Sequence, residues 1–156
     1  MKKFIAFFLS AIMVFSLLTA CGGTSEQSDL EYVKNKGTLV VGITEFAPMD
    51  YQDENGNWIG FDAEMATLFA EKLGVDVKFV LIDWKRKIPE LDGKTIDCVW
   101  NGMTLTDEVT SALECSKAYC ENAQIVIVPA AEQDSYQTAE SCKELTFAVE
   151  AGSAGK

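Results

Sequence analysis

The sequence predicts an α/β domain built around a parallel β-sheet. Three short apolar runs rich in β-branched residues lie at 38–43, 75–82 and 95–100, and such runs are typical of strands. Helical patterns lie between and after them, at 62–73 and 84–91. Because strands that alternate with helices favour a parallel sheet, we expect ligands to bind beyond the carboxyl ends of these strands.

The chain opens with a predicted export signal. Met1-Lys2-Lys3 is cationic, residues 4–18 are almost all apolar, and Leu18-Thr19-Ala20-Cys21 places small residues before a cysteine. The apolar run is shorter than the ~20 residues that span a bilayer and has no basic stop-transfer flank. We therefore expect residues 1–20 to be a cleaved signal peptide.

The Leu-Thr-Ala-Cys ending resembles a bacterial lipobox, in which the cysteine becomes the lipidated first residue. Cys21 would then hold the domain to a membrane through its acyl chains, and residues 21–30 would be a flexible tether. An ordinary secretory peptide that ends near a cysteine is the alternative. The lipid interpretation predicts a location on the outer face of the cytoplasmic membrane, or in the periplasm.

Composition excludes several classes of function. Removal of the signal takes away Lys2 and Lys3 and leaves 11 basic against 24 acidic residues, a net charge of −13, so a nucleic-acid partner is not expected. The chain has no histidine, which excludes histidine-activated nucleophiles and histidine-ligated zinc within it.

Four cysteines remain after Cys21, and none of them forms a Cys-x-x-Cys pair. Metal and redox motifs are therefore unsupported, and we expect no cofactor. Outside the cytoplasm the four thiols could form disulfides in one of three connectivities. Cys98 lies in an apolar strand pattern and is expected to be a buried thiol.

The elements between these runs have recognisable boundaries. Residues 51–59 place Asp53-Glu54-Asn55-Gly56-Asn57 between aromatic positions, which predicts a hairpin. Asp62 is a good N-cap for the helix that follows, and Gly74 is a good C-terminal stop.

The last third predicts an incomplete second unit. Residues 124–129 are expected to form a strand, and the polar, small residues at 130–144 a connector. A new strand begins at 145–149, a glycine-rich turn follows at 152–155, and the chain then stops. Because one strand and a turn cannot bury their own faces, we expect a truncated chain.

Several motifs in order resemble one family. The chain is similar over 38–155 to the polar amino-acid-binding family of extracytoplasmic solute-binding proteins of ABC importers. The similarity rests on these pieces: Phe46-Ala47-Pro48-Met49, Gly60-Phe61-Asp62-Ala63-Glu64, Ile82-Asp83-Trp84, Asn101-Gly102-Met103-Thr104, Glu121-Asn122-Ala123-Gln124 and Val149-Glu150-Ala151-Gly152-Ser153.

The resemblance implies a periplasmic-binding-protein-like type II clamshell of two lobes. Lobe one would occupy 31–129 and be mostly present, 130–144 would be the connector, and 145–156 would be the start of a truncated lobe two. It also implies capture of an amino acid, a small zwitterion, for an ABC permease in the membrane.

The resemblance further implies a ligand site at the strand ends. Phe46 and Trp84 match aromatics that sandwich the ligand, with burial in the core as the alternative. Asn101, Gly102 and Thr104 match a loop whose backbone and hydroxyl groups hold the α-amino and α-carboxylate groups.

A second part of the site is implied in lobe two. Gly152 and Ser153 match an anion-holding turn at a helix N-terminus. A phosphate loop is excluded, because its first glycine would fall at Glu150.

One position departs from the family pattern. Family members usually carry an arginine that clamps the ligand carboxylate where this chain has Val109. The only arginine is Arg86, so Arg86 is the remaining candidate for a guanidinium clamp, and a solvated helix face is its alternative. The sequence therefore leaves the ligand unnamed.

Other interpretations are weaker. A calcium loop around Asp53 fails, because Tyr51 falls where the first acidic ligand belongs. A dehydratase on the same fold would need an acid or base in the cleft, with Glu45 or Glu150 as candidates. A sensor module of a membrane receptor would need a transmembrane segment after Lys156. We expect a binding protein, not an enzyme.

Overall fold

The computed structural model describes residues 27–155 and divides the chain into two units, 1–32 and 33–156. The predicted signal peptide, Cys21 and most of the tether lie outside the described residues. The first unit contributes the opening turn of helix α2 (Asp29–Lys36), where Ser28 Oγ accepts a hydrogen bond from the Glu31 amide at 3.3 Å. In the described part, no helix is long and apolar enough to cross a membrane.

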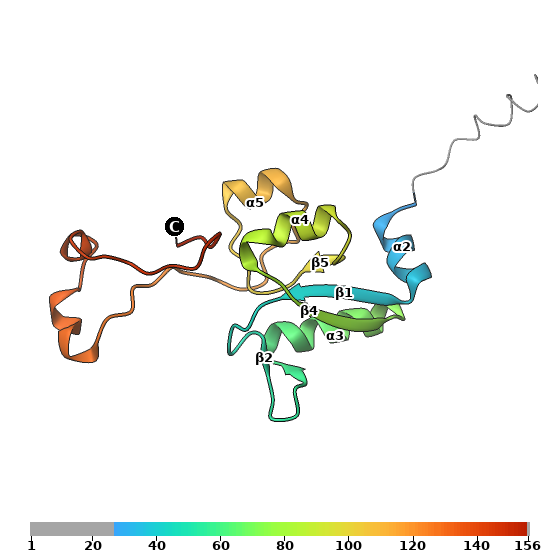
Figure 1. The fold of residues 1–156 in the computed structure, drawn as a ribbon, viewed down its shortest axis with the longest axis horizontal. Coiled ribbons are helices and arrows are strands. Elements are labelled where there is room, and N and C mark those ends of the chain that lie inside the picture. Colours follow the sequence, from blue (N-terminus) through green and yellow to red (C-terminus); the bar gives the residue numbers. More distant parts are fainter. Residues whose placement is uncertain (1–26, 156) are drawn as a thin grey trace, which may run out of the picture. The chain divides into compact units, whose positions relative to one another are not determined.

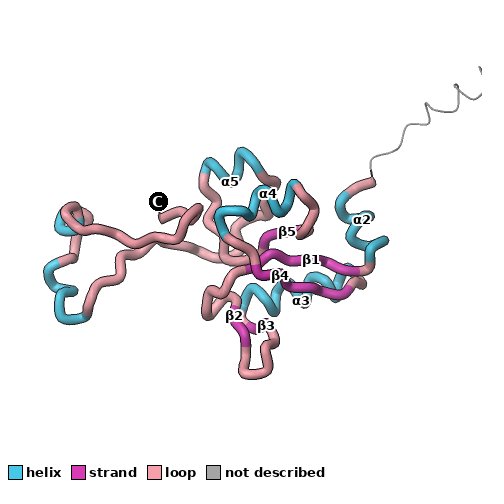
Figure 2. Tube along the Cα trace, in the orientation of Figure 1, coloured by secondary structure: helices cyan, strands magenta, loops and turns pink. Residues whose placement is uncertain are grey.

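The second unit is built on a parallel sheet of three strands, as predicted (Figure 1; Figure 2). Strand β1 (Thr38–Ile43) lies between β4 (Asp76–Leu81) and β5 (Cys98–Val99), and both neighbours run parallel to it. β5 is shorter than the predicted strand at 95–100, because only Cys98 and Val99 of that segment pair with β1.

Different helices pack against the two faces of the sheet. Leu39, Val41 and Ile43 of β1 form one core cluster with Ala66 and Ala70 of α3 (Phe61–Leu73). The intervening side chains face the other way, as the period of a strand requires.

On that second face, Val40 packs against a cluster formed by Ile82, Trp84 and Ile96. Gly42 lies so close to Ile96 that an added Cβ would come within 2.6 Å of Ile96 Cδ1. β1 is therefore buried on both faces.

The predicted hairpin is confirmed. β2 (Tyr51–Gln52) pairs antiparallel with β3 (Trp58–Ile59). At its tip Asp53 Oδ1 accepts from the amides of Asn55 and Asn57, both at 2.8 Å. Asn57 Nδ2 also donates to Asp53 Oδ2 at 3.0 Å. This side-chain hydrogen bond contributes most to lowering the pKa of Asp53, and the amide hydrogen bonds lower it further.

The predicted start of α3 is wrong by two residues. The N-cap position is Gly60, whose φ of 112° suits glycine alone, and Asp62 lies inside the first turn, fully buried. A tertiary contact has overridden the local preference, because Asp62 Oδ1 accepts a hydrogen bond from the Tyr119 hydroxyl at 2.8 Å. The helix ends as predicted, with Gly74 in the left-handed conformation.

Two short helices follow β4 on the second face. The predicted helix at 84–91 is divided into a 3₁₀ turn η2 (Trp84–Arg86) and α4 (Lys87–Asp92). Pro89 fits because it lies in the first turn of α4, where no intrahelical donor is needed. α5 (Asp107–Ala112) is capped by Thr106, whose hydroxyl accepts from the Val109 amide.

The strands predicted at 124–129 and 145–149 do not form. Among the described residues, neither segment has a partner strand, and Ile125 and Ile127 are 77% and 87% exposed. A strand needs a partner for its backbone groups, so apolar pattern alone did not suffice. The connector between them carries only 3₁₀ turns, η3 (Ala130–Ser135) and η4 (Glu140–Cys142).

Candidate functional site

The three parallel strands end at one edge of the sheet. Ile43 pairs with Leu81, and Gly42 pairs with Val99, so the ends of the strands lie level. The segments after them, 44–49, 83–84 and 101–104, therefore leave the sheet together (Figure 1). This is the edge at which the sequence placed the ligand.

A side-chain clamp joins two of these strand ends. Asn101 Oδ1 accepts from the Thr44 amide at 2.8 Å, and Asn101 Nδ2 donates to Thr44 Oγ1 at 2.7 Å. The Asn101 side chain is buried. Its amide thus holds the loops after β1 and β5 in register, while the predicted ligand contact through its backbone stays a prediction.

Phe46 and Gly102 are brought together. Phe46 N donates to Asp50 O at 2.6 Å and Asp50 N donates to Phe46 O at 3.0 Å, which closes a tight turn after β1. Half of Phe46 is exposed, and a Cβ added to Gly102 would lie 3.3 Å from Phe46 Cε1. Gly102 has a φ of 57°, so glycine supplies both the turn and the room for the ring.

Two buried carboxyl groups lie behind this pair, and the sequence analysis missed their role. Asp50 and Asp62 are both fully buried. Neither oxygen of Asp50 has a hydrogen-bond partner in the described structure, and Asp62 Oδ2 has none. Burial, together with the nearby Asp62 carboxylate, raises the pKa of Asp50 to about 7.

The pKa of Asp62 is raised by burial, and its neighbours limit the rise. The Tyr119 hydroxyl donates to Asp62 Oδ1, while the Gly102 amide and the Trp100 indole lie near enough to lower the pKa without reaching normal hydrogen-bond geometry. Burial and the Asp62 contact raise the pKa of Tyr119 in turn. The Asp62 carboxyl group thus lies next to Gly102, where an added Cβ would come within 3.5 Å of Asp62 Oδ2.

Trp84 and Gly152 form a second group through a lysine. Trp84 is 9% exposed and packs with Ile82 and Ile96. The Nζ of Lys87 lies 4.8 Å from the centre of the Trp84 ring and donates to Gly152 O at 2.9 Å. Among the described residues, the ring pairs do not include Phe46 with Trp84, so the predicted aromatic sandwich stays a prediction.

Three other predicted site residues have partners inside the protein. Arg86 is largely exposed and its Nε lies 3.5 Å from Glu90 Oε1, which agrees better with a solvated helix face than with a clamp. Thr104 Oγ1 accepts from Asn122 Nδ2. Ser153 N donates to Glu150 O at 3.1 Å, and no helix follows it in the described residues.

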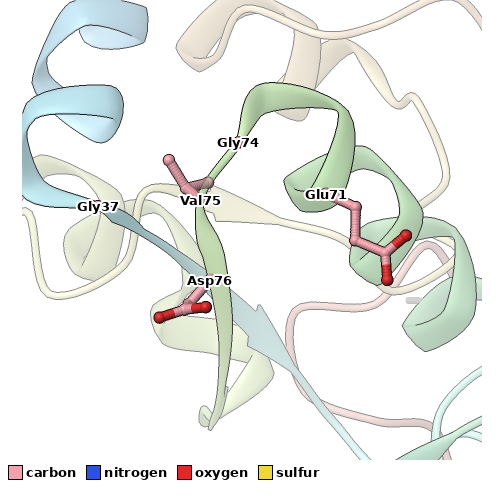
Figure 3. Close-up of a pocket in the computed structure, with 5 residues that line it drawn as sticks. All are labelled: Gly37, Glu71, Gly74, Val75 and Asp76. Atoms are coloured by element: carbon pink, nitrogen blue, oxygen red, sulfur yellow. The ribbon is translucent and has the colours of Figure 1, made fainter.

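Two cavities of the described structure lie away from this edge. One of about 320 Å³ is lined by Gly37, Glu71, Gly74, Val75 and Asp76 (Figure 3). Its residues flank the first residues of β1 and β4, at the amino ends of the parallel strands. A second, of about 340 Å³, lies on α3 and β3. Neither contains a predicted site residue.

The described residues contain no group of three or more acidic, cysteine or histidine side chains placed to hold a metal ion. The four described thiols are free. Cys98 is largely buried, and burial, with the nearby Asp97 carboxylate, raises its pKa to about 12. The Cys98 thiol is therefore not activated as a nucleophile.

The fold is α/β and matches lobe one of a type II periplasmic-binding-protein-like clamshell. A histidine-bound substrate-binding protein of an ABC uptake transporter from Streptococcus pneumoniae is similar at a TM-score of 0.57 and 34% identity, over 62% of this chain and 39% of that one. Residues 39–152 match the model of the bacterial extracellular solute-binding proteins, family 3. The chain belongs to this family, which confirms the resemblance seen in the sequence.

Two curated relatives show the range of the family. The arginine-binding extracellular protein ArtP of Bacillus subtilis (strain 168) is 30% identical over 98% of this chain and 57% of its own length. The cyclohexadienyl dehydratase of Pseudomonas aeruginosa is 26% identical over 90% of this chain and 53% of its own. The chain spans about half the length of the curated relatives it matches.

Proposed function

We propose that this chain is the ligand-capturing lobe of an extracytoplasmic amino-acid receptor that serves an ABC permease. The observation that carries the proposal is the Phe46 ring, half exposed at the carboxyl edge of the sheet and held against the backbone of Gly102. An exposed ring offers apolar area and a face for an ammonium group. Family membership and the arginine- and histidine-binding relatives support the same class of ligand.

The proposed mechanism is capture by a shift of population. Ligand contacts to both lobes would make a closed form favourable, and the permease would bind that form. The acyl chains on Cys21 would keep the receptor at the membrane face where the permease lies. No covalent step is needed.

The test is a thermal-stability survey of the protein with each of the twenty amino acids, short peptides and keto acids. We expect one chemical group of amino acids to raise Tm, because a ligand that binds only the folded state stabilises it by mass action. No shift with any amino acid, or a shift with keto acids alone, would contradict the proposal.

A dehydratase is the second candidate, because one relative carries that activity. Glu45 and Glu150 are both exposed, and the carboxyl group with the raised pKa, Asp50, is fully buried and out of reach of a substrate. Binding is therefore the better supported function. Release of a dehydrated product from a cyclic amino-acid precursor would reverse this preference.

A further inference from the structure

Lys87 is a buried cation at the candidate site that the sequence analysis did not select. It is the first residue of α4 and is 4% exposed. Its Nζ donates to Gly152 O at 2.9 Å and to Trp84 O at 3.4 Å. It also lies over the Trp84 ring. All of these contacts are with neutral groups.

Two carboxylates close to Lys87 in the sequence are paired with other cations. Lys85 Nζ lies 3.5 Å from Asp83 Oδ2, and Arg86 Nε lies 3.5 Å from Glu90 Oε1. None of the ion pairs in the described structure includes Lys87. A buried ammonium without an anion is costly, since carbonyl dipoles and a ring replace only part of its hydration.

The geometry leaves Lys87 able to bind one more acceptor. An ammonium group has three donors, and the two carbonyl oxygens use two of them. The backbone at Gly152 packs against the backbone at Lys85 and accepts the hydrogen bond from Lys87, so it helps to cover the Lys87 ammonium group. If that segment moves away, Nζ is uncovered beside Trp84 and loses its nearer acceptor.

We propose that the Lys87 ammonium is the cation that binds the α-carboxylate of the captured amino acid. This inference rests on the proposed function and deepens it. One carboxylate oxygen takes the place of the Gly152 carbonyl and the other accepts from the third N–H donor, so the charge that the protein leaves unpaired becomes paired. Lys87 then supplies the cation for the ligand carboxylate. Val109 cannot supply it because its side chain is uncharged, and Arg86 is already paired with Glu90.

The experiment uses the full chain and the amino acid that stabilises it most in the survey, together with the α-carboxamide of that amino acid. Lys87→Gln removes the charge but keeps a donor for the Gly152 carbonyl. Lys87→Arg keeps the charge. Lys85→Gln is the matched control, because Lys85 is a neighbouring lysine whose side chain is 60% exposed.

We expect Lys87→Gln to weaken binding of the acid by about 10- to 100-fold, the range of a charge-assisted hydrogen bond. Binding of the amide should change by less than about 3-fold, and Lys85→Gln should bind both as the wild type does. Lys87→Arg should keep most of the preference for the acid. Equal losses on acid and amide, or no loss, would overturn the inference and leave the proposed function standing.

A measurement on the wild type covers the case in which Lys87→Gln does not fold. In protein labelled with ¹⁵N at lysine Nζ, the Lys87 signal, identified by its absence from Lys87→Arg, should shift with the acid and not with the amide. An unchanged signal in the bound protein overturns the inference. If the wild type binds no amino acid at all, the proposed function fails first.

Discussion

The buried carboxyl groups of Asp50 and Asp62 should make stability depend on pH. The pKa of Asp50 is raised from 3.8 to about 7 in the folded protein, so folding favours its protonated form. Its contribution to stability is therefore full below pH 3.8 and is lost as the pH rises towards 7. We expect the free energy of unfolding to fall between pH 4 and pH 7, by an amount on the order of 4 kcal/mol from this group.

Urea unfolding of the wild type and of Asp50→Asn at pH 5 and pH 8 tests this expectation. The variant cannot ionise at position 50, so its difference in stability between the two pH values should be smaller than that of the wild type. Because each protein is compared with itself at two pH values, any cost of the substitution that does not depend on pH cancels. An unchanged pH dependence in Asp50→Asn would show that Asp50 does not titrate in this range.

The role of Gly102 can be tested by comparison with Gly56, which also has a positive φ but has no atoms near an added Cβ. Gly102 and Gly56 have φ values of 57° and 79°, and only an added Cβ at Gly102 meets other atoms, those of Phe46 and Asp62. Alanine at either position should cost about 1 kcal/mol of stability through its backbone. Only Gly102→Ala should also weaken amino-acid binding, as titration calorimetry would show. Equal affinity of the two variants for the amino acid would show that Phe46 and Gly102 are not part of the binding site.

At the scale of elements, the clamp between Asn101 and Thr44 joins the ends of β1 and β5. Asn101→Ala leaves the Thr44 amide and hydroxyl without their partner, which should cost about 1 to 3 kcal/mol. Asn55→Ala, at the exposed hairpin tip, should change stability by less than about 0.5 kcal/mol. Denaturant unfolding measures both. A loss below that of Asn55→Ala would mean that strand pairing alone fixes the two loops.

Over the whole of the described chain, we expect stability to be uneven. Strand β1 is paired on both sides, whereas residues 124–129 and 145–149 have exposed apolar side chains and no partner strand in the described part. In the chain of 156 residues, amide hydrogens at 38–43 should exchange slowly and those at 124–129 rapidly. Mass spectrometry of peptic fragments would measure this. Slow exchange at 124–129 would reveal pairing that the structure does not contain.

Local pattern was sufficient for several parts of the fold. The β-branched runs predicted at 38–43 and 75–82 form strands at 38–43 and 76–81, and the turn at Asp53 and the glycine stop at Gly74 occur where they were predicted, because each depends on residues close in sequence. Pattern was insufficient where distant residues decide. Asp62 is a good N-cap in isolation, but Tyr119, far along the chain, draws it into the interior.

Local pattern was enough to predict the parallel sheet, the hairpin and the body and end of α3, because apolar period and turn chemistry are local properties. The ligand site at the carboxyl edge stays a prediction. Which side chains meet at that edge depends on how distant segments pack. The tertiary structure placed Phe46 against Gly102, buried Asp50 beside Asp62, and put Lys87 beside Trp84 without a carboxylate. Such meetings depend on packing between segments far apart in the chain, and burial then fixes the charge and hydrogen-bond partners of each group.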